Sequence, residues 1–181
     1  MTRRVMVTLV AVLFVAACGG GSSGSKKLAL GTEADVAYTS AGGTSGAAST
    51  TLGVTVLKVR AGTQEELTSA GFQVEDKDKD ATPYYVDVKY ANKGTSAVPR
   101  QLSVGLEDKS DNSVPTLLVT SLTSEPFDLC KDASSSSPLN PGESYESCTL
   151  FLVPKGTNLD RARFVSQGPD AKITFTDWAV S

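Results

Sequence analysis

The sequence predicts an all-β fold, an antiparallel β-sandwich of about eight strands. Short runs rich in Val, Thr, Tyr, Phe and Leu alternate along the chain with clusters of Gly, Pro, Asn, Asp and Ser, which is typical of strands joined by turns. Helical periodicity is nearly absent, so the crossover helices that a parallel sheet requires are missing. Alternation alone does not show whether a sheet closes on itself, so a closed barrel remains an alternative to the sandwich.

Residues 1–17 have the features of a secretory signal peptide. Two arginines precede an apolar run from Val5 to Ala17, which is too short to span a bilayer core of about 30 Å. The segment Val15-Ala16-Ala17-Cys18 then resembles the lipobox of bacterial lipoproteins. This resemblance implies that the chain is cut before Cys18 and that the Cys18 thiol carries a diacylglyceryl group. The alternative is an ordinary secreted protein with a chance cysteine at this position.

Residues 18–31 are predicted to be the lipidated cysteine and a tether, and residues 32–181 the folded domain. From Gly19 to Lys27 the sequence is Gly-Gly-Gly-Ser-Ser-Gly-Ser-Lys-Lys, a flexible coil with a root-mean-square span of roughly 15–18 Å. Two acyl chains are sufficient for stable anchoring. We therefore expect a protein held on the extracytoplasmic face of the cell membrane.

The two remaining cysteines, Cys130 and Cys148, are predicted to form a disulfide. Export places the protein in an oxidising setting, where an even pair of cysteines usually bonds. The bond would close a loop of 18 residues and stabilise the fold by about 3 kcal/mol. A redox-active or metal-binding pair is the alternative, but neither a C-x-x-C spacing nor a histidine accompanies these cysteines.

The first half of the domain shows two strand patterns and one helical signal. Strands are expected at Ala34–Tyr38 and Thr51–Arg60. Between them, residues 40–50 are rich in Ser, Gly, Ala and Thr, and they fit either an inter-strand loop or a further part of the tether. Thr63 and Glu66 have the spacing of a capping box, which predicts one or two helical turns at this point.

Pro83–Ala91 alternates as a half-buried antiparallel strand does. Its two faces carry Tyr84, Val86, Val88 and Tyr90 on one side and Tyr85, Asp87 and Lys89 on the other. The turn Asn92-Lys93-Gly94 follows. Further strands are expected at Val98–Glu107, Thr116–Thr120, Tyr145–Val153, Arg161–Ser166 and Lys172–Ala179.

Three of these strands carry a specific expectation about their faces. In Val98–Glu107, the residues Leu102, Val104 and Leu106 are expected to point inward. Tyr145–Val153 has apolar residues on both faces, so both are expected to be covered. In Lys172–Ala179, Ile173 and Phe175 lie opposite Thr174, Thr176 and Trp178.

Three stretches together resemble a family of immunoglobulin-like, telokin-like domains of unknown function. They are Tyr84–Gly94, which ends in Asn-Lys-Gly, the Pro-Gly-Glu loop Leu139–Glu143, and the strand Thr149–Pro154. Such domains occur mostly in lipoproteins of Gram-positive bacteria, and the resemblance covers roughly residues 34–178. It implies an immunoglobulin-like sandwich and an extracytoplasmic location. The family has no established catalytic residues, so the resemblance adds no chemistry.

The composition excludes several classes of function. Among the 181 residues there is no histidine, which removes Ser-His and Cys-His nucleophiles and every His-containing zinc or haem site. With 17 Lys and Arg against 20 Asp and Glu, the formal charge is −3, which argues against nucleic acid as a partner. We expect no cofactor and no metal.

Acidic residues provide the remaining candidates for chemistry. Asp76, Asp78 and Asp80 have the D-x-D-x-D spacing of a calcium loop. Ala81 replaces the glycine that such a loop needs, and the interleaved lysines cancel the charge, so a solvated mixed-charge loop is favoured while cation binding stays open. Adjacent carboxylates such as Glu65-Glu66 and Glu107-Asp108 could serve as acid and base, although most such pairs decorate turns.

The favoured function is therefore binding by a non-enzymatic, lipid-anchored module whose partner is an envelope protein or a small ligand. Tyr85 and Trp178 are expected to point outward and are the candidates for a partner patch. One alternative is a carboxylate-based hydrolase of cell-wall glycans, which needs two carboxyl groups facing each other across a cleft at roughly 5–9.5 Å. The other is a structural spacer, which predicts no concave pocket and no large apolar patch.

Overall fold

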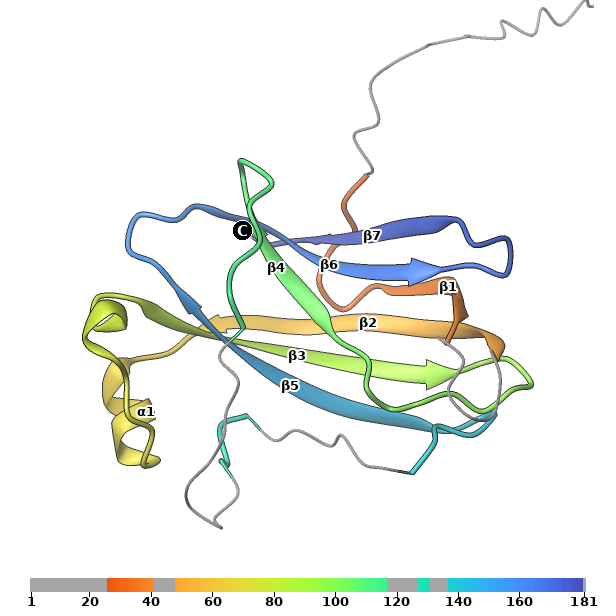
Figure 1. Ribbon diagram of the computed structural model, residues 1–181, viewed down its shortest axis with the longest axis horizontal. Helices are drawn as coiled ribbons and strands as arrows, with labels where there is room; N and C mark the ends of the chain where they lie inside the picture. The colour runs from red at the N-terminus through yellow and green to blue at the C-terminus, as the bar shows by residue number, and fades with distance from the viewer. Residues whose placement is uncertain (1–25, 41–47, 117–126, 131–136, 181) are drawn as a thin grey trace, which may run out of the picture.

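The computed structural model describes residues 26–40, 48–116, 127–130 and 137–180. These residues form two antiparallel sheets that pack face to face, so the fold is a β-sandwich as predicted and not a closed barrel (Figure 1). The described residues contain seven strands rather than eight. The expected strand Thr116–Thr120 lies outside the described residues from position 117 onward, as do the signal peptide, Cys18 and residues 41–47 of the first loop.

The larger sheet has the strand order β1-β2-β3-β5 and the smaller sheet has the order β4-β6-β7. The larger sheet consists of β1 (Glu33–Thr39), β2 (Ser49–Ala61), β3 (Thr82–Asn92) and β5 (Ser144–Val153). The smaller sheet consists of β4 (Val104–Asp108), β6 (Leu159–Gln167) and β7 (Ile173–Ala179). The connection from β2 to β3 holds the helix α1 (Gln64–Ser69), whose predicted capping box is confirmed, and the 3₁₀ turn η1 (Asp76–Asp78).

The main core lies between the two sheets. Its largest fully buried members include Trp178, Tyr90, Phe151 and Phe164. The predicted inward residues of β3 and of the β4 region lie in this core: Val86, Val88, Tyr90, Leu102, Val104 and Leu106.

The prediction that Trp178 points outward is wrong. Trp178 is 0% exposed, whereas Ile173 and Phe175, on the other face of β7, are 57% and 53% exposed. The indole Nε1 of Trp178 donates a hydrogen bond of 2.8 Å to the carbonyl of Thr32, so the polar end of the ring is satisfied inside the protein.

A second apolar cluster covers the outer face of the larger sheet. Tyr85, Cys148, Leu150 and Leu152 project from β3 and β5, and Leu67 of α1 packs on them. Both faces of β5 are therefore covered, as its sequence predicts. Phe127 and Cys130, from the connection between β4 and β5, pack against the same cluster.

The turn at Asn92-Lys93-Gly94 joins two different sheets. Asn92 is 1% exposed, and its side-chain amide donates hydrogen bonds to the carbonyls of Ser96 and Leu139. Its side-chain oxygen accepts hydrogen bonds from the Thr50 hydroxyl at 2.6 Å and the Gly94 amide at 3.1 Å. A single buried asparagine thus holds the corner where the chain leaves β3 for the smaller sheet, which is a different role from the hairpin turn that Asn-x-Gly often makes.

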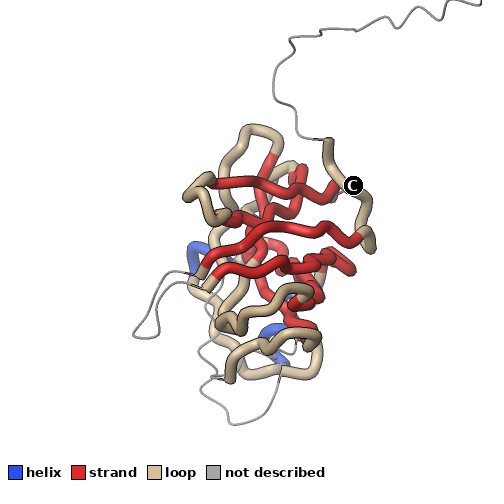
Figure 2. Tube along the Cα trace, turned by 90° about the vertical axis from the view of Figure 1, so that its right-hand side faces the viewer, coloured by secondary structure: helices blue, strands red, loops and turns tan. Residues whose placement is uncertain are grey.

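The folded part begins earlier than the predicted boundary at residue 32. Leu28 pairs in parallel with Trp178, and the ammonium of Lys27 lies 2.5 Å from the carboxylate of Asp160. Figure 2 shows the described N-terminal segment leaving the sandwich beside the C-terminus. Within the residues that the structure describes, no helix is long and apolar enough to cross a membrane.

Candidate functional site: a groove beside the disulfide

A disulfide attaches residues 127–130 to the outer face of the larger sheet. Cys130 and Cys148 are bonded, with their Cα atoms 5.0 Å apart, and this is the pair that the sequence predicts. Phe127 packs edge to face on Phe72, with ring centroids 4.9 Å apart, and lies 5.8 Å from the ring of Tyr85. The disulfide and the ring of Phe127 therefore both hold this short segment against the larger sheet.

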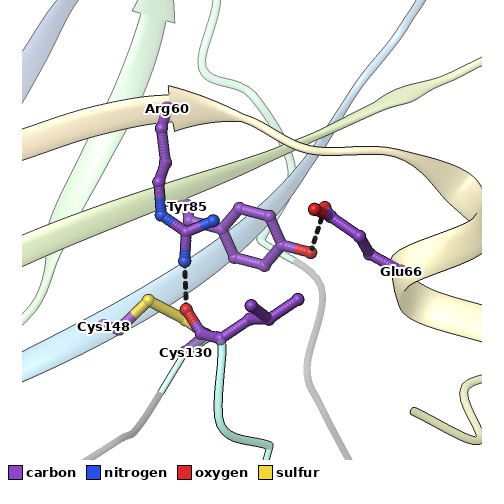
Figure 3. The surroundings of a disulfide bond; sticks show 6 residues. Arg60, Glu66, Tyr85, Cys130 and Cys148 are labelled. Carbon is purple, nitrogen blue, oxygen red and sulfur yellow. Dashed lines mark hydrogen bonds between the residues drawn. A yellow bond between two sulfur atoms is a disulfide. The ribbon is translucent and has the colours of Figure 1, made fainter. Parts of the chain in front are cut away.

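Tyr85 lies beneath this segment and is not a surface residue. Its side chain is 0% exposed, so the prediction that it points outward to a partner is wrong. The guanidinium carbon of Arg60 lies 4.0 Å from its ring centroid, and the Tyr85 hydroxyl donates to Glu66 at 3.4 Å (Figure 3). Burial, reinforced by the charge of Glu66, raises the pKa of Tyr85 above its usual value.

Arg60 connects the sheet to the disulfide segment. Besides stacking on Tyr85, its guanidinium donates a hydrogen bond to the backbone carbonyl of Leu129 (Figure 3). Arg60 comes from β2, Tyr85 from β3 and Glu66 from α1. Because both the disulfide and Arg60 hold it, the segment containing Leu129 has a defined position above the sheet.

A β-bulge in β2 changes which side chains face this region. Val56 pairs with Val88 and Lys58 pairs with Asp87, so Leu57 is an extra residue in β2. Leu57 and Lys58 are both exposed, whereas Val54 and Val56 before them are fully buried. A bulge redirects side chains in this way and often lies beside a functional site.

The bulge was not predicted, although the spacing of the valines in β2 carries a signal for it. Val54 and Val56 are two residues apart, but the next valine of the strand, Val59, follows after three. A change of spacing of this kind marks an extra residue in an alternating strand.

The bulge and the disulfide segment both line a groove of about 550 Å³. Its lining residues are Leu57, Lys58, Asp87, Asp128, Leu129, Glu146, Ser147 and Cys148. Leu57 and Leu129 are 36% and 40% exposed, so both contribute a partly exposed apolar side chain to the groove. This volume lies in the range of roughly 300–1,000 Å³ found for ligand sites.

The groove is acidic. Asp87 and Glu146 project from neighbouring strands on the same face of the sheet, since Asp87 pairs with Cys148 and Lys89 pairs with Glu146. No lysine or arginine of the described residues forms an ion pair with either carboxylate. The lining has three carboxylates against one lysine. A groove with partly exposed leucines and a net negative charge favours a ligand that combines a positive charge with an apolar group.

The other acidic candidates have structural roles or are fully solvated. Asp76 is 93% exposed and pairs with Lys79, and the described residues contain no group of three or more His, Cys, Asp or Glu side chains that could hold a metal ion. Glu66 completes the cap of α1. Hydrogen bonds from Asn112 hold the pKa of Asp108 below its usual value. Glu107 is paired with two arginines of β6.

Comparison with known proteins identifies the fold but no family. No known protein family and no curated protein matches the chain. The secreted protein MPT63 of Mycobacterium tuberculosis matches with a TM-score of 0.52 at 12% identity, over 88% of this chain and 100% of that one. A hypothetical protein from Bacillus anthracis matches with a TM-score of 0.45 at 17% identity, over 72% of this chain and 87% of that one. The chain therefore shares its β-sandwich fold with a secreted bacterial protein.

Proposed function

We propose that this protein is a lipid-anchored, extracytoplasmic, immunoglobulin-like module that binds a segment of an envelope protein or a small ligand in the groove beside its disulfide. The observation that carries the proposal is the groove itself, whose two walls are set by the bulge at Leu57 and by the disulfide-held Leu129. Neither feature is needed to complete the sandwich core. Loop and rim features held by a rigid scaffold are where binding residues concentrate.

The proposed location has three independent supports. Residues 15–18 resemble a lipobox, a disulfide is characteristic of exported proteins, and the shared fold occurs in a secreted bacterial protein. The strand and turn motifs that resemble telokin-like domains agree with this location. A simple test is Cys18→Ser, which should move the protein from the membrane fraction to the medium. Continued retention in the membrane would contradict the lipid anchor.

Binding is favoured over catalysis because the chain has no histidine and its groove is open to solvent. The second candidate, a carboxylate-based glycan hydrolase, is supported by one observation: Asp87 and Glu146 face the same groove. Turnover of cell-wall glycans by the exported protein, abolished by Glu146→Gln, would favour that candidate. The spacer alternative predicts no concave pocket, and the groove argues against it.

The binding proposal is tested by photocrosslinking in intact cells. A photoreactive amino acid is placed at Leu57 or Leu129, and the matched control is Leu30, which is 37% exposed and lies outside the groove. We expect a discrete adduct from Leu57 and Leu129 that is absent from Leu30. Adding Glu146→Lys should remove the adduct, because it cancels the net negative charge of the residues that line the groove. Equal adducts from all three positions, or adducts insensitive to Glu146→Lys, would contradict the proposal.

A further inference from the structure

The outer face of the smaller sheet carries an exposed apolar triad, formed by Val165, Ile173 and Phe175. These side chains are 52%, 57% and 53% exposed. Val165 of β6 pairs directly with Phe175 of β7, and Ile173 lies two residues away on the same face of β7. The triad is therefore one continuous patch, and it ends at an edge of the sheet because β7 is an edge strand.

The edge of β7 also offers backbone hydrogen-bonding groups. Leu28 donates to the carbonyl of Asp177 and accepts from the amide of Ala179, so these backbone groups point away from β6. The backbone N–H and C=O groups of successive residues in a strand point alternately to its two sides. The groups of Ile173 and Phe175 therefore point away from β6, on the same side as those of Asp177 and Ala179. Leu28 covers only the end of this edge at Trp178, and no other described residue pairs with it.

Each of the other three sheet edges has at least one charged or covering contact within the described residues. On β1, Glu33 and Asp35 are held by Lys93. The edge of β4 is covered where the Val114 amide donates to the Leu106 carbonyl. On β5, Thr116 forms a bridge with Phe151. Charged and covered edges prevent strand addition, and the stretch of β7 from residue 173 to 176 has neither kind of protection.

We propose that a second copy of this chain pairs with β7, edge to edge and antiparallel, about a two-fold axis at Thr174. In this register Ile173 lies opposite the partner's Phe175, and Phe175 lies opposite the partner's Ile173. Both pairs use the open backbone groups, which allows four hydrogen bonds across the axis. A register centred on Phe175 would instead require the edge groups of Asp177, which Leu28 already occupies.

Side-chain chemistry agrees with self-pairing in this register. The two triads join into one apolar surface on a six-stranded sheet, and an aromatic residue opposite a β-branched one is a favourable cross-strand pair. The charge beside the patch is already neutralised, because Arg163 stacks on Phe175 at 4.8 Å and pairs with Asp177 and Glu107. Lys172 falls opposite the partner's Thr176, so no like charges meet.

The area points to a weak dimer. Burying the exposed parts of the triad covers on the order of 300 Å² in each copy, well below the roughly 800 Å² per partner of a standard stable interface. We therefore expect dissociation at micromolar concentration and association at higher concentration. The dimer does not depend on the proposed groove or anchor, although anchoring in one membrane would raise the effective concentration.

Cysteine crosslinking tests the register. In the exported chain carrying Cys18→Ser, Thr174→Cys would lie with its Cα atom about 4.5 Å from that of the partner's residue 174, within disulfide range. Mild oxidation at high protein concentration should give a dimer linked through residue 174, as mapped by mass spectrometry. Leu30→Cys, also exposed, controls for random collision. Crosslinking of Thr174→Cys no faster than that of Leu30→Cys would overturn the proposal.

Sedimentation equilibrium tests the interface without a new cysteine. The mean mass should rise with concentration in the Cys18→Ser chain, and Phe175→Lys should abolish the rise because it places a charge on the edge. Val165→Lys, on β6 and away from the edge, should weaken association less. Monomer at every concentration would overturn the proposal, as would a larger effect of Val165→Lys than of Phe175→Lys, which would indicate packing through the sheet face.

Discussion

Arg161 of β6 and Glu107 of β4 form an ion pair with 2.6 Å between nitrogen and oxygen, and their side chains are only 9% and 12% exposed. Asp111, Asp160 and Asp177 surround the same guanidinium. Hydrogen bonds to Asp111 and Glu107 hold the pKa of Arg161 above its ordinary value. This network covers one end of the outer face of the smaller sheet.

Arg161→Met should destabilise the protein by about 3 kcal/mol, because it leaves carboxylates in a buried position with less compensation. Lys155→Met, at an exposed position, is the control and should change stability by less than about 0.5 kcal/mol. Urea unfolding followed by the fluorescence of Trp178 measures both. Equal unfolding midpoints for the two variants would show that the network contributes little.

Stability should fall on acidification, and Asp160 should account for part of the fall. Hydrogen bonding to Lys27 holds the pKa of Asp160 below its ordinary value of 3.8. A carboxylate with a lowered folded-state pKa contributes stability that is present above the unfolded value and is lost as the pH falls through the folded value. Asp160→Asn should therefore reduce stability at pH 7 and flatten its dependence on pH below about 4. An unchanged slope between pH 5 and pH 2, measured by urea unfolding, would contradict this assignment.

Removing the disulfide should destabilise the fold and open the groove. Cys130→Ser with Cys148→Ser should cost about 3 kcal/mol, because the bond closes a loop with a sequence separation of 18. Amide hydrogen exchange should also increase at residues 127–130, because the disulfide holds this segment against the sheet. Exchange in β6 and β7, which the disulfide does not touch, should change little. Exchange that rises equally in every strand would indicate global loosening and not release of the groove wall.

Two glycines form a matched pair for mutation. A Cβ atom at Gly94 would lie 2.1 Å from the Thr50 hydroxyl and 2.8 Å from the backbone nitrogen of Thr51, whereas one at Gly105 would meet nothing within 4 Å. Gly94→Ala should therefore cost about 1–3 kcal/mol, because backbone must move. Gly105→Ala should be neutral or stabilising by up to about 1 kcal/mol. Similar thermal midpoints for the two variants would contradict the close approach at the Asn92 corner.

Local patterns in the sequence were sufficient to place most elements. The capping box of Thr63 and Glu66 begins α1 as predicted, and β3 matches its predicted bounds within one residue at each end. Both signals depend on residues a few positions apart. In the cap, a side chain accepts a hydrogen bond from the backbone amide three residues later, and in the strand, apolar residues recur with a period of two. Such signals are present in the sequence before any tertiary contact forms.

The face that each strand turns to the core was harder to predict. β7 alternates between Ile173 and Phe175 on one side and Thr174, Thr176 and Trp178 on the other, so its apolar residues divide between both faces. Trp178 is inside because its ring packs in the core between the two sheets and its indole N–H donates to the Thr32 carbonyl. Tyr85 is buried because α1 and the segment at Phe127 cover the outer face of β3. The covering segments are distant in sequence, so the pattern within the strand does not predict them.

The candidate site likewise combines features that the sequence predicts with features that depend on tertiary packing. The sequence by itself determined the all-β class, the capped helical turn and the pairing of Cys130 with Cys148, because period, turn chemistry and the count of cysteines are properties of the chain. Only the tertiary structure decided that Leu57 and Leu129, which are far apart in sequence, line the same acidic groove. It also left Phe175 exposed at an open edge. The physical reason is that every alternating strand has two faces, and only packing against segments remote in sequence determines which face is buried.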